Sequence, residues 1–297
     1  MCDNADMEPR TLFSKIVLIL KQGLPYLGLF VIVVLGSLVA DYVGVPRSES
    51  DSSEVRLFDT GSSCNVMGIE IRGCIVTYMP DEKESATQNT SDMCDTYTSS
   101  EEVVSMIETA AADDNIKAVL LEIDSFGGSP VASEEVATAL KALNKPSVAW
   151  IRGSGDSGAY WIASAAGTIV ASENSDVGGI GVTQSYVDYA EQNKNEGLRY
   201  NQLISGKYKD MGSPDRPLTA EERALLQRDL DIMHDNFIRT VAENRKLSID
   251  TVRALADGST MLGKMAKEKG LVDVLGTKDV VWQTLGTKIG DEPDVCW

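Results

Sequence analysis

The chain has few basic side chains and only one histidine, and both shortages limit what it can do. It carries 27 lysines and arginines against 45 aspartates and glutamates in 297 residues, a formal charge of −18. So negative a chain repels phosphate backbones, which argues against nucleic-acid binding. Proline is also sparse, with nine residues, and 43% of the chain is hydrophobic, so a folded core is favoured over a disordered chain.

The scarcity of histidine narrows the choice of a catalytic base. Ser157 lies in the sharp segment Gly155-Asp156-Ser157-Gly158, between an apolar strand-like run and a helix-like run. A hydroxyl group on such a glycine-flanked turn needs a base to become a nucleophile. Farther along the chain, the segment Ser205–Asp210 offers Lys209 as that base. A serine paired with a lysine points to a peptidase.

The serine segment also imitates that of chymotrypsin-like proteases, but the rest of the chain does not fit them. Those enzymes need a histidine ahead of the serine in the chain, whereas His234 lies behind Ser157. The alternation of strand-like and helix-like runs also contradicts their two-barrel β fold. His234 falls in the middle of a predicted helix, where we expect a surface or partly packed side chain.

An apolar run near the N-terminus predicts a membrane anchor. Residues 22–40 carry no charge, and residues 22–45 give roughly 20 residues of span, enough to cross the hydrocarbon at about 1.5 Å per residue. Lys15 and Lys21 precede the run, so residues 1–21 are expected in the cytoplasm and the large domain outside the cell membrane. A cleaved signal peptide is the alternative, but one of the two small residues that its cleavage site requires is missing.

The remainder of the chain divides into a linker, a domain and a tail. Residues 46–65 are rich in Ser, Asp and Glu without a sustained period, which indicates a linker. Residues 66–285 are assigned to the domain and residues 286–297 to a C-terminal tail. Four cysteines follow the anchor, at Cys64, Cys74, Cys94 and Cys296, in a potentially oxidising space. Their spacing fits no metal site, and the sequence leaves open whether they pair or remain free thiols.

Strands and helices alternate through the domain. Strands are expected at residues 68–77, 118–123, 147–151 and 168–171, and a long helix runs from about 219 to 244. Strands separated by helices of about a dozen residues favour a parallel sheet with crossover helices, hence an α/β fold.

Two glycine-rich turns at the ends of these strands have a chemical meaning. Gly127 and Gly128 follow one strand, and Gly158 directly follows Ser157 after the next. At a helix start the free N–H groups point outward and favour negative charge. We therefore expect N–H groups of Gly127, Gly128 and Gly158 to hold an oxyanion.

Five segments together resemble the signal peptide peptidase A (SppA) family. Leu121–Ser129 is similar to its "IDSPGG" turn, and Asp156–Ala163 looks like its "ASGGYYIA" segment. The other three are Ile169–Val182, Ser205–Glu222 and Lys264–Val274. Each segment alone is weak evidence, but five in the same order with sensible spacing, over about Met67 to Gly276, are specific.

The resemblance implies an α/β fold of the Clp-protease/crotonase-like class, built from stacked ββα units. It also implies a serine–lysine dyad in which Ser157 is the nucleophile and Lys209, rather than Lys207, the general base. Neighbouring subunits of a homo-oligomeric ring would share each dyad. The substrates would be signal peptide remnants and other membrane-associated or unfolded peptides, and neither a metal nor an organic cofactor is required.

The chain departs from the family pattern at two positions that affect chemistry. Asp156 replaces a small apolar residue before the nucleophile, and Gly179 stands where the family often has a serine that orients the lysine. Thr183, Ser185 or Ser213 could take over that role. A catalytically weak scaffold or peptide-binding module on the same fold is therefore the alternative function, and a crotonase-type acyl-CoA enzyme is disfavoured by the anchor and the lysine segment.

Overall fold

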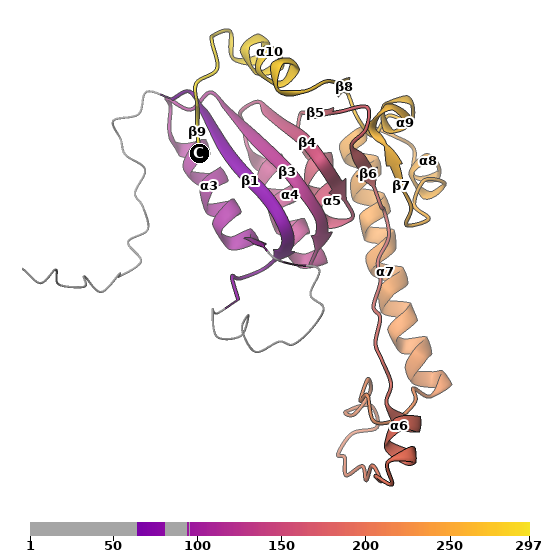
Figure 1. Ribbon diagram of the computed structural model, residues 1–297. Helices are drawn as coiled ribbons and strands as arrows, with labels where there is room; N and C mark the ends of the chain where they lie inside the picture. Colours follow the sequence, from indigo (N-terminus) through magenta and orange to yellow (C-terminus); the bar gives the residue numbers. More distant parts are fainter. Residues whose placement is uncertain (1–63, 81–93, 95) are drawn as a thin grey trace, which may run out of the picture. The chain divides into compact units, whose positions relative to one another are not determined.

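A parallel sheet carries the fold. The computed structural model describes residues 64–80, 94 and 96–297. In this part of the chain the strands follow the order β2-β1-β3-β4-β5-β8, all neighbours parallel, with β9 beside β1, β6 beside β4 and β7 antiparallel to β6 (Figure 1). The strands are β1 (Val66–Val76), β2 (Tyr97–Ser99), β3 (Ala118–Gly128), β4 (Ser147–Asp156), β5 (Thr168–Ala171), β6 (Asp176–Gly178), β7 (Thr260–Leu262), β8 (Val274–Leu275) and β9 (Val295–Cys296). The expectation of an α/β fold with a parallel sheet is confirmed.

Helices connect the parallel strands, as crossover connections require. They are α3 (Ser100–Ala112), α4 (Pro130–Ala142), α5 (Gly158–Ser164), α6 (Ala190–Asn195), α7 (Ala220–Arg245), α8 (Ile249–Arg253), α9 (Gly263–Glu268) and α10 (Lys278–Ile289). Side chains cap several of them. Ser99 accepts a hydrogen bond from the Glu102 N–H at the start of α3, and Thr219 and Glu222 form a reciprocal capping box on α7.

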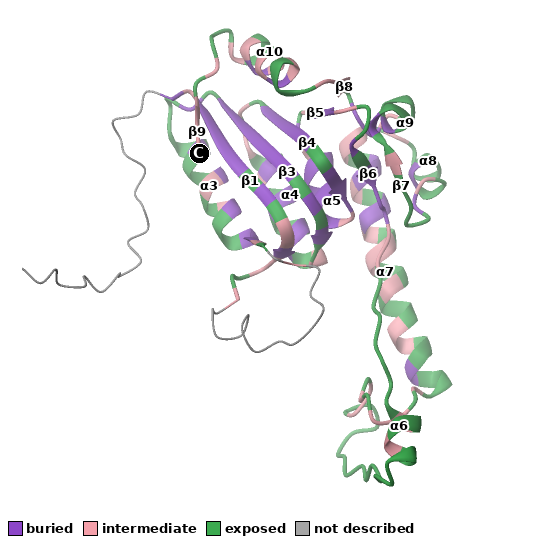
Figure 2. Ribbon diagram, viewed as in Figure 1, coloured by how far each residue is buried: buried purple, intermediate pink, exposed green. Residues whose placement is uncertain are grey.

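Both faces of the sheet are buried, which explains the uninterrupted apolar strands (Figure 2). In β3, Val119, Leu121 and Ile123 face a large core that includes side chains of α3, α4, α5 and α7. The intervening Ala118 and Leu120 face a smaller core covered by α10. Because successive side chains of a strand point to opposite faces, one apolar run serves both cores.

Two disulfides answer the question that the sequence leaves open, whether the four cysteines pair. Cys64 bonds Cys296 across 232 residues of sequence, and Cys74 bonds Cys94 across 20. Strand pairing brings the first two together, because β9 lies beside the start of β1. Sequence spacing could not reveal this contact. Residues 286–297, assigned to a tail by the sequence, thus include the end of α10 and the edge strand β9.

The predicted membrane anchor, residues 22–45, lies outside the described residues, as do residues 1–21 and nearly all of the linker 46–65. Within the part of the chain that the structure describes, no helix has the length and hydropathy needed to cross a bilayer.

Candidate active site

Ser157 occupies a strained turn at the carboxyl edge of the sheet. It joins the end of β4 to the start of α5, with φ 52° and ψ −124°. Positive φ is rare outside glycine and costs free energy, so neighbouring contacts must hold the turn in place. One of them is the hydrogen bond that the Ser157 N–H donates to the Gly178 carbonyl of β6, at 2.8 Å.

The glycine turn at the end of β3 packs directly against Ser157, as the parallel strand order predicts. Gly127 has φ +98°, and a Cβ placed there would come 2.6 Å from the Gly158 nitrogen and 2.9 Å from the Ser157 Cβ. A Cβ at Gly158 would in turn lie 3.3 Å from the Gly128 nitrogen. The two turns meet because the carboxyl ends of adjacent parallel strands share one edge of the sheet.

Of the three glycines expected to hold an oxyanion, two are placed to do so. The Gly127 N–H donates to the Ser125 hydroxyl at 3.1 Å, so this donor is already used. The Ser129 N–H donates a hydrogen bond to the Ile75 carbonyl of β1. Because N–H groups alternate sides along a strand, the N–H group of Gly128 points away from β1. The Gly158 N–H belongs to the first turn of α5, where helical N–H groups lack partners within the helix. Gly128 and Gly158 thus form the candidate oxyanion site.

A cavity of about 580 Å³ opens beside Ser157. Its lining includes Gly128 and Gly158, the candidate oxyanion glycines, with Asp156 and the aromatic side chains of Trp161 and Phe237. Burial, and secondarily the negative charge of Asp176, raises the pKa of Asp156 to about 6. The cavity is large enough for a side chain of a peptide whose carbonyl group lies at Ser157.

Lys209 lies away from this cavity within one chain. It is exposed, on the segment 183–219 that precedes α7. The adjacent Lys207 and Tyr208 contact Glu221 in the first turn of α7, whereas His234, farther along that helix, lines the Ser157 cavity. The helix between positions 221 and 234 spans about 20 Å, more than a lysine side chain can bridge. The structure thus keeps the two predicted dyad residues apart within a single copy.

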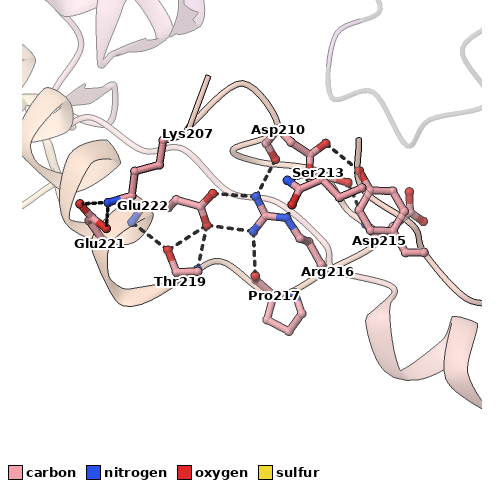
Figure 3. A network of polar contacts seen from close by, with 11 residues as sticks. Lys207, Asp210, Ser213, Asp215, Arg216, Pro217, Thr219, Glu221 and Glu222 are labelled. Atoms are coloured by element: carbon pink, nitrogen blue, oxygen red, sulfur yellow. Dashed lines mark hydrogen bonds and ion pairs between the residues drawn. The ribbon is translucent and has the colours of Figure 1, made fainter. Parts of the chain in front are cut away.

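An ion-pair network anchors the lysine segment to α7. Figure 3 shows the Arg216 guanidinium between Asp210 and Glu222, to which it donates hydrogen bonds of 2.6 to 3.0 Å. Arg216 and Thr219 together lower the pKa of Glu222 to about 2, so the carboxylate stays ionised. Lys209 comes directly before Asp210, so this network fixes the backbone from which the lysine projects.

The same network separates the two lysines of the segment. Lys207 forms an ion pair with Glu221 at 2.6 Å. Its side-chain hydrogen bonds, first with Glu221 and then with Tyr208, raise the pKa of Lys207. A raised pKa holds the amine in its charged form, the opposite of what a general base needs. Among the described residues no carboxylate forms an ion pair with Lys209.

Several cavity residues were not predicted from the sequence. His234 is partly buried, as expected, but it also lines the cavity, together with Trp161, Phe237 and Asp257. The helix period could have indicated that His234 and Phe237 lie together, because positions 234 and 237 are one turn apart and share a face of α7. Asp257 belongs to a loop, so no periodic pattern could predict that it lines the cavity. Thr183 also lines the cavity, whereas Gly179, with φ +57°, lies where a side chain would be strained.

Comparison with known proteins assigns the family. The model of peptidase family S49 matches residues 139–290, just over half of the chain, including Ser157, Lys209 and most of the cavity. The chain belongs to peptidase family S49. The resemblance to SppA proteins is thereby confirmed, since proteins of that name are among its relatives.

Two relatives show how far the similarity extends. A putative protease of Methanocaldococcus jannaschii is 39% identical over 178 residues, which cover 59% of this chain and 57% of that protein. The putative signal peptide peptidase SppA of Enterococcus faecium is 34% identical over 167 residues, covering 55% of this chain and 48% of that one. The chain therefore matches about half of the length of these S49 relatives.

A solved structure, that of a ClpP1 mutant from Listeria monocytogenes, is also similar, with a TM-score of 0.46 and 15% identity over 71% of this chain and 92% of that one. So loose a likeness bears on neither activity nor assembly, and the Clp-protease/crotonase-like class stays a prediction.

Proposed function

We propose that this S49 protein is a serine endopeptidase in which Ser157 attacks the peptide carbonyl and Lys209 of a neighbouring copy accepts the serine proton. The observation that carries the proposal is the turn of Ser157 itself. Ser157 directly precedes Gly158 and packs against the glycine turn at Gly127, and Gly128 and Gly158, whose N–H groups suit a developing oxyanion, line the same cavity as Ser157. Few arrangements other than acyl transfer use a serine and such a pair of donors together.

The lysine step requires a change of surroundings. An amine accepts a proton only when it is neutral, and burial in apolar surroundings favours the neutral form of a lysine. Lys209 is exposed in one copy, so a second copy would both bury the amine and bring it to Ser157. The protonated lysine would then give its proton to the leaving amine of the substrate.

The surface around Lys209 supports a neighbour at this place. Large apolar side chains are exposed on the same segment: Tyr186, Val187, Tyr189, Leu198, Tyr200, Leu203 and Ile204. Leu203 is 97% exposed. Such a concentration of exposed apolar side chains marks an interaction surface. A homo-oligomeric ring that covers this segment would form dyads between adjacent copies.

We further propose that the domain lies outside the cytoplasm, anchored by residues 22–45, and degrades signal peptide remnants and other membrane-associated peptides. Two disulfides support an oxidising compartment, because thiols stay reduced in most cytosols. An anchored peptidase would meet peptides that are released within the bilayer.

Mixing two inactive variants tests the shared dyad. The full-length protein should cleave casein, whereas Ser157→Ala and Lys209→Ala should each lose activity, and Lys207→Ala should retain it. Co-expressed Ser157→Ala and Lys209→Ala chains should recover part of the activity, because mixed oligomers contain intact pairs. Equal cleavage by wild type and both single variants would show that the assignment is wrong. No cleavage by assembled wild type would favour the scaffold alternative.

A further inference from the structure

The cavity beside Ser157 contains a buried carboxylate that the proposed reaction does not use. Asp156 immediately precedes the nucleophile, is 6% exposed and lines the cavity. In the described part of the chain nothing donates a hydrogen bond to its Oδ1. Burying a polar group without a partner costs free energy, so a partner outside the described residues is expected.

Two more polar atoms in this cavity lack partners. Among the described residues, four buried side-chain atoms have no hydrogen-bond partner. Three of the four, Asp156 Oδ1, Trp161 Nε1 and His234 Nε2, belong to residues that line this one cavity. Of these atoms, Asp156 Oδ1 can only accept a hydrogen bond and Trp161 Nε1–H can only donate one, so a bound group that donates would complete the carboxylate but not the indole.

The charged residues that line the cavity indicate which sign of charge the bound group carries. Asp156 and Asp257 line it, whereas no lysine or arginine of the described residues does. Ser259 donates two hydrogen bonds to Asp257 and lowers its pKa, so this carboxylate is ionised at neutral pH. Asp176 of β6 adds negative charge close to Asp156. A cavity with this lining attracts a cation.

The walls suit a cation on a flexible apolar stem. Trp161 and Phe237 stack with ring centroids 4.7 Å apart and an angle of 13°, and both line the cavity. Val182 adds an aliphatic surface. A lysine side chain places its methylene groups along such surfaces while its ammonium group reaches a carboxylate. An ammonium group near an aromatic face gains further attraction.

We propose that this cavity is a substrate subsite for a basic side chain, lysine foremost, on the acyl side of the scissile bond. The inference rests on the proposed function, because it takes Ser157 as the nucleophile. The substrate carbonyl would lie between Ser157 and the N–H groups of Gly128 and Gly158. The side chain of the same residue would then extend along Trp161 to the Asp156 carboxylate.

A second cation could reach the same carboxylate, namely Lys209 of a neighbouring copy. The two sources differ in what they predict. A substrate ammonium group makes Asp156 important only for basic peptides, whereas a Lys209 contact makes it equally important for every peptide. Comparing substrates that differ by the ammonium group alone separates them.

The experiment uses the full-length protein and three fluorogenic peptides that differ only in the residue before the cleaved bond. Lysine is compared with norleucine, which has the same chain length without the ammonium group, and with glutamate. We expect kcat/KM for lysine to exceed that for norleucine by at least about tenfold, because a site built for a polar group discriminates against a substrate that lacks it. Glutamate should be cleaved worst.

Asp156→Asn keeps the shape and removes the charge, and should bring the lysine-to-norleucine ratio close to one. The matched control is Glu108→Gln, which removes an exposed carboxylate on α3 and should leave the ratio unchanged. If Asp156→Asn cleaves too slowly to measure, binding of the lysine and norleucine peptides is compared by fluorescence anisotropy in Ser157→Ala with and without Asp156→Asn.

Two results would overturn the subsite. One is a wild-type enzyme that cleaves norleucine as well as lysine or better. The other is an Asp156→Asn variant that slows both peptides by the same factor, which would assign the carboxylate to Lys209 or to structure. Either result, with activity that still depends on Ser157 and Lys209, leaves the proposed peptidase intact. Cleavage that survives Ser157→Ala would refute the peptidase assignment instead.

Discussion

Gly127 and Ser157 lie so close together that any side chain at position 127 would clash with Ser157. A Cβ at Gly127 would come 2.9 Å from the Ser157 Cβ, and Gly127 already has φ +98°. The carboxyl ends of β3 and β4 thus meet with no room between them. In the proposed mechanism, the alignment of Ser157 with the N–H groups of Gly128 and Gly158 depends on this contact.

Gly127→Ala should therefore impair both folding and catalysis. The strained backbone is expected to cost roughly 1–3 kcal/mol of unfolding free energy, measured by urea denaturation. Displacement of the Gly158 N–H should lower kcat/KM by about 100-fold. Gly197→Ala is the control, because Gly197 also has positive φ but a Cβ there would meet no atom within 4 Å. Equal activity in the Gly127 and Gly197 variants would contradict the oxyanion assignment.

Asp156 should make the protein less stable as pH rises. Burial raises its pKa from 3.8 to about 6, so the folded state binds this proton more tightly than the unfolded state. The resulting penalty is absent below about pH 4, grows up to about pH 6 and stays constant above it. Asp176, Asp257 and His234 are the other titratable groups around this cavity.

Asp156→Asn should consequently stabilise the fold at pH 8 by roughly 1–3 kcal/mol relative to wild type, and by almost nothing at pH 4. Urea denaturation at the two pH values measures the difference. Asp188→Asn, on an exposed loop, serves as the control for a general charge effect. A gain that is the same at both pH values would rule out ionisation of Asp156 as the cause.

The disulfides should contribute unequally to stability. The Cys64–Cys296 bond closes a loop over nearly the whole described domain, and longer loops lose more chain entropy in the unfolded state. Replacing both cysteines by serine should cost about 2–4 kcal/mol, and the Cys74–Cys94 pair somewhat less. Denaturation of each double variant with and without reductant is the measurement. A reductant that leaves wild-type stability unchanged would show that the bonds do not form.

Arg216 should hold the lysine segment rather than the core. It connects Asp210, next to Lys209, with Glu222 in the first turn of α7. Arg216→Gln removes both ion pairs, so segment 183–219 should exchange amide hydrogens faster while the sheet keeps its protection. Activity should fall because Lys209 loses its fixed backbone. Arg239→Gln, in α7 and with a described hydrogen bond only to Asn236 of the same helix, should show neither effect.

Four strands (β1, β3, β4 and β5), their parallel arrangement and the serine turn could be predicted because local patterns encode them, whereas the short strands β2 and β6 to β9 and the strand order could not. Apolar runs bounded by glycine-rich turns predict buried strands, and the Ser157 turn follows such a run in β4. The family resemblance already implies Lys209 rather than Lys207 as the general base. The structure adds a physical difference, because Lys207 forms an ion pair with Glu221.

The rest depended on contacts between distant parts of the chain. Cys296 reaches Cys64 because β9 pairs with β1, and His234 reaches the Ser157 cavity because α7 packs against α5. Residue patterns alone therefore predict the α/β alternation and the sharp turn at Ser157, because both depend on near neighbours and on helix or strand period, while the resemblance of five segments indicates the family. Only the folded chain shows which candidate oxyanion N–H groups are free, which cysteines pair and how far Lys209 lies from Ser157 in one copy. Packing sets those distances, and local patterns do not.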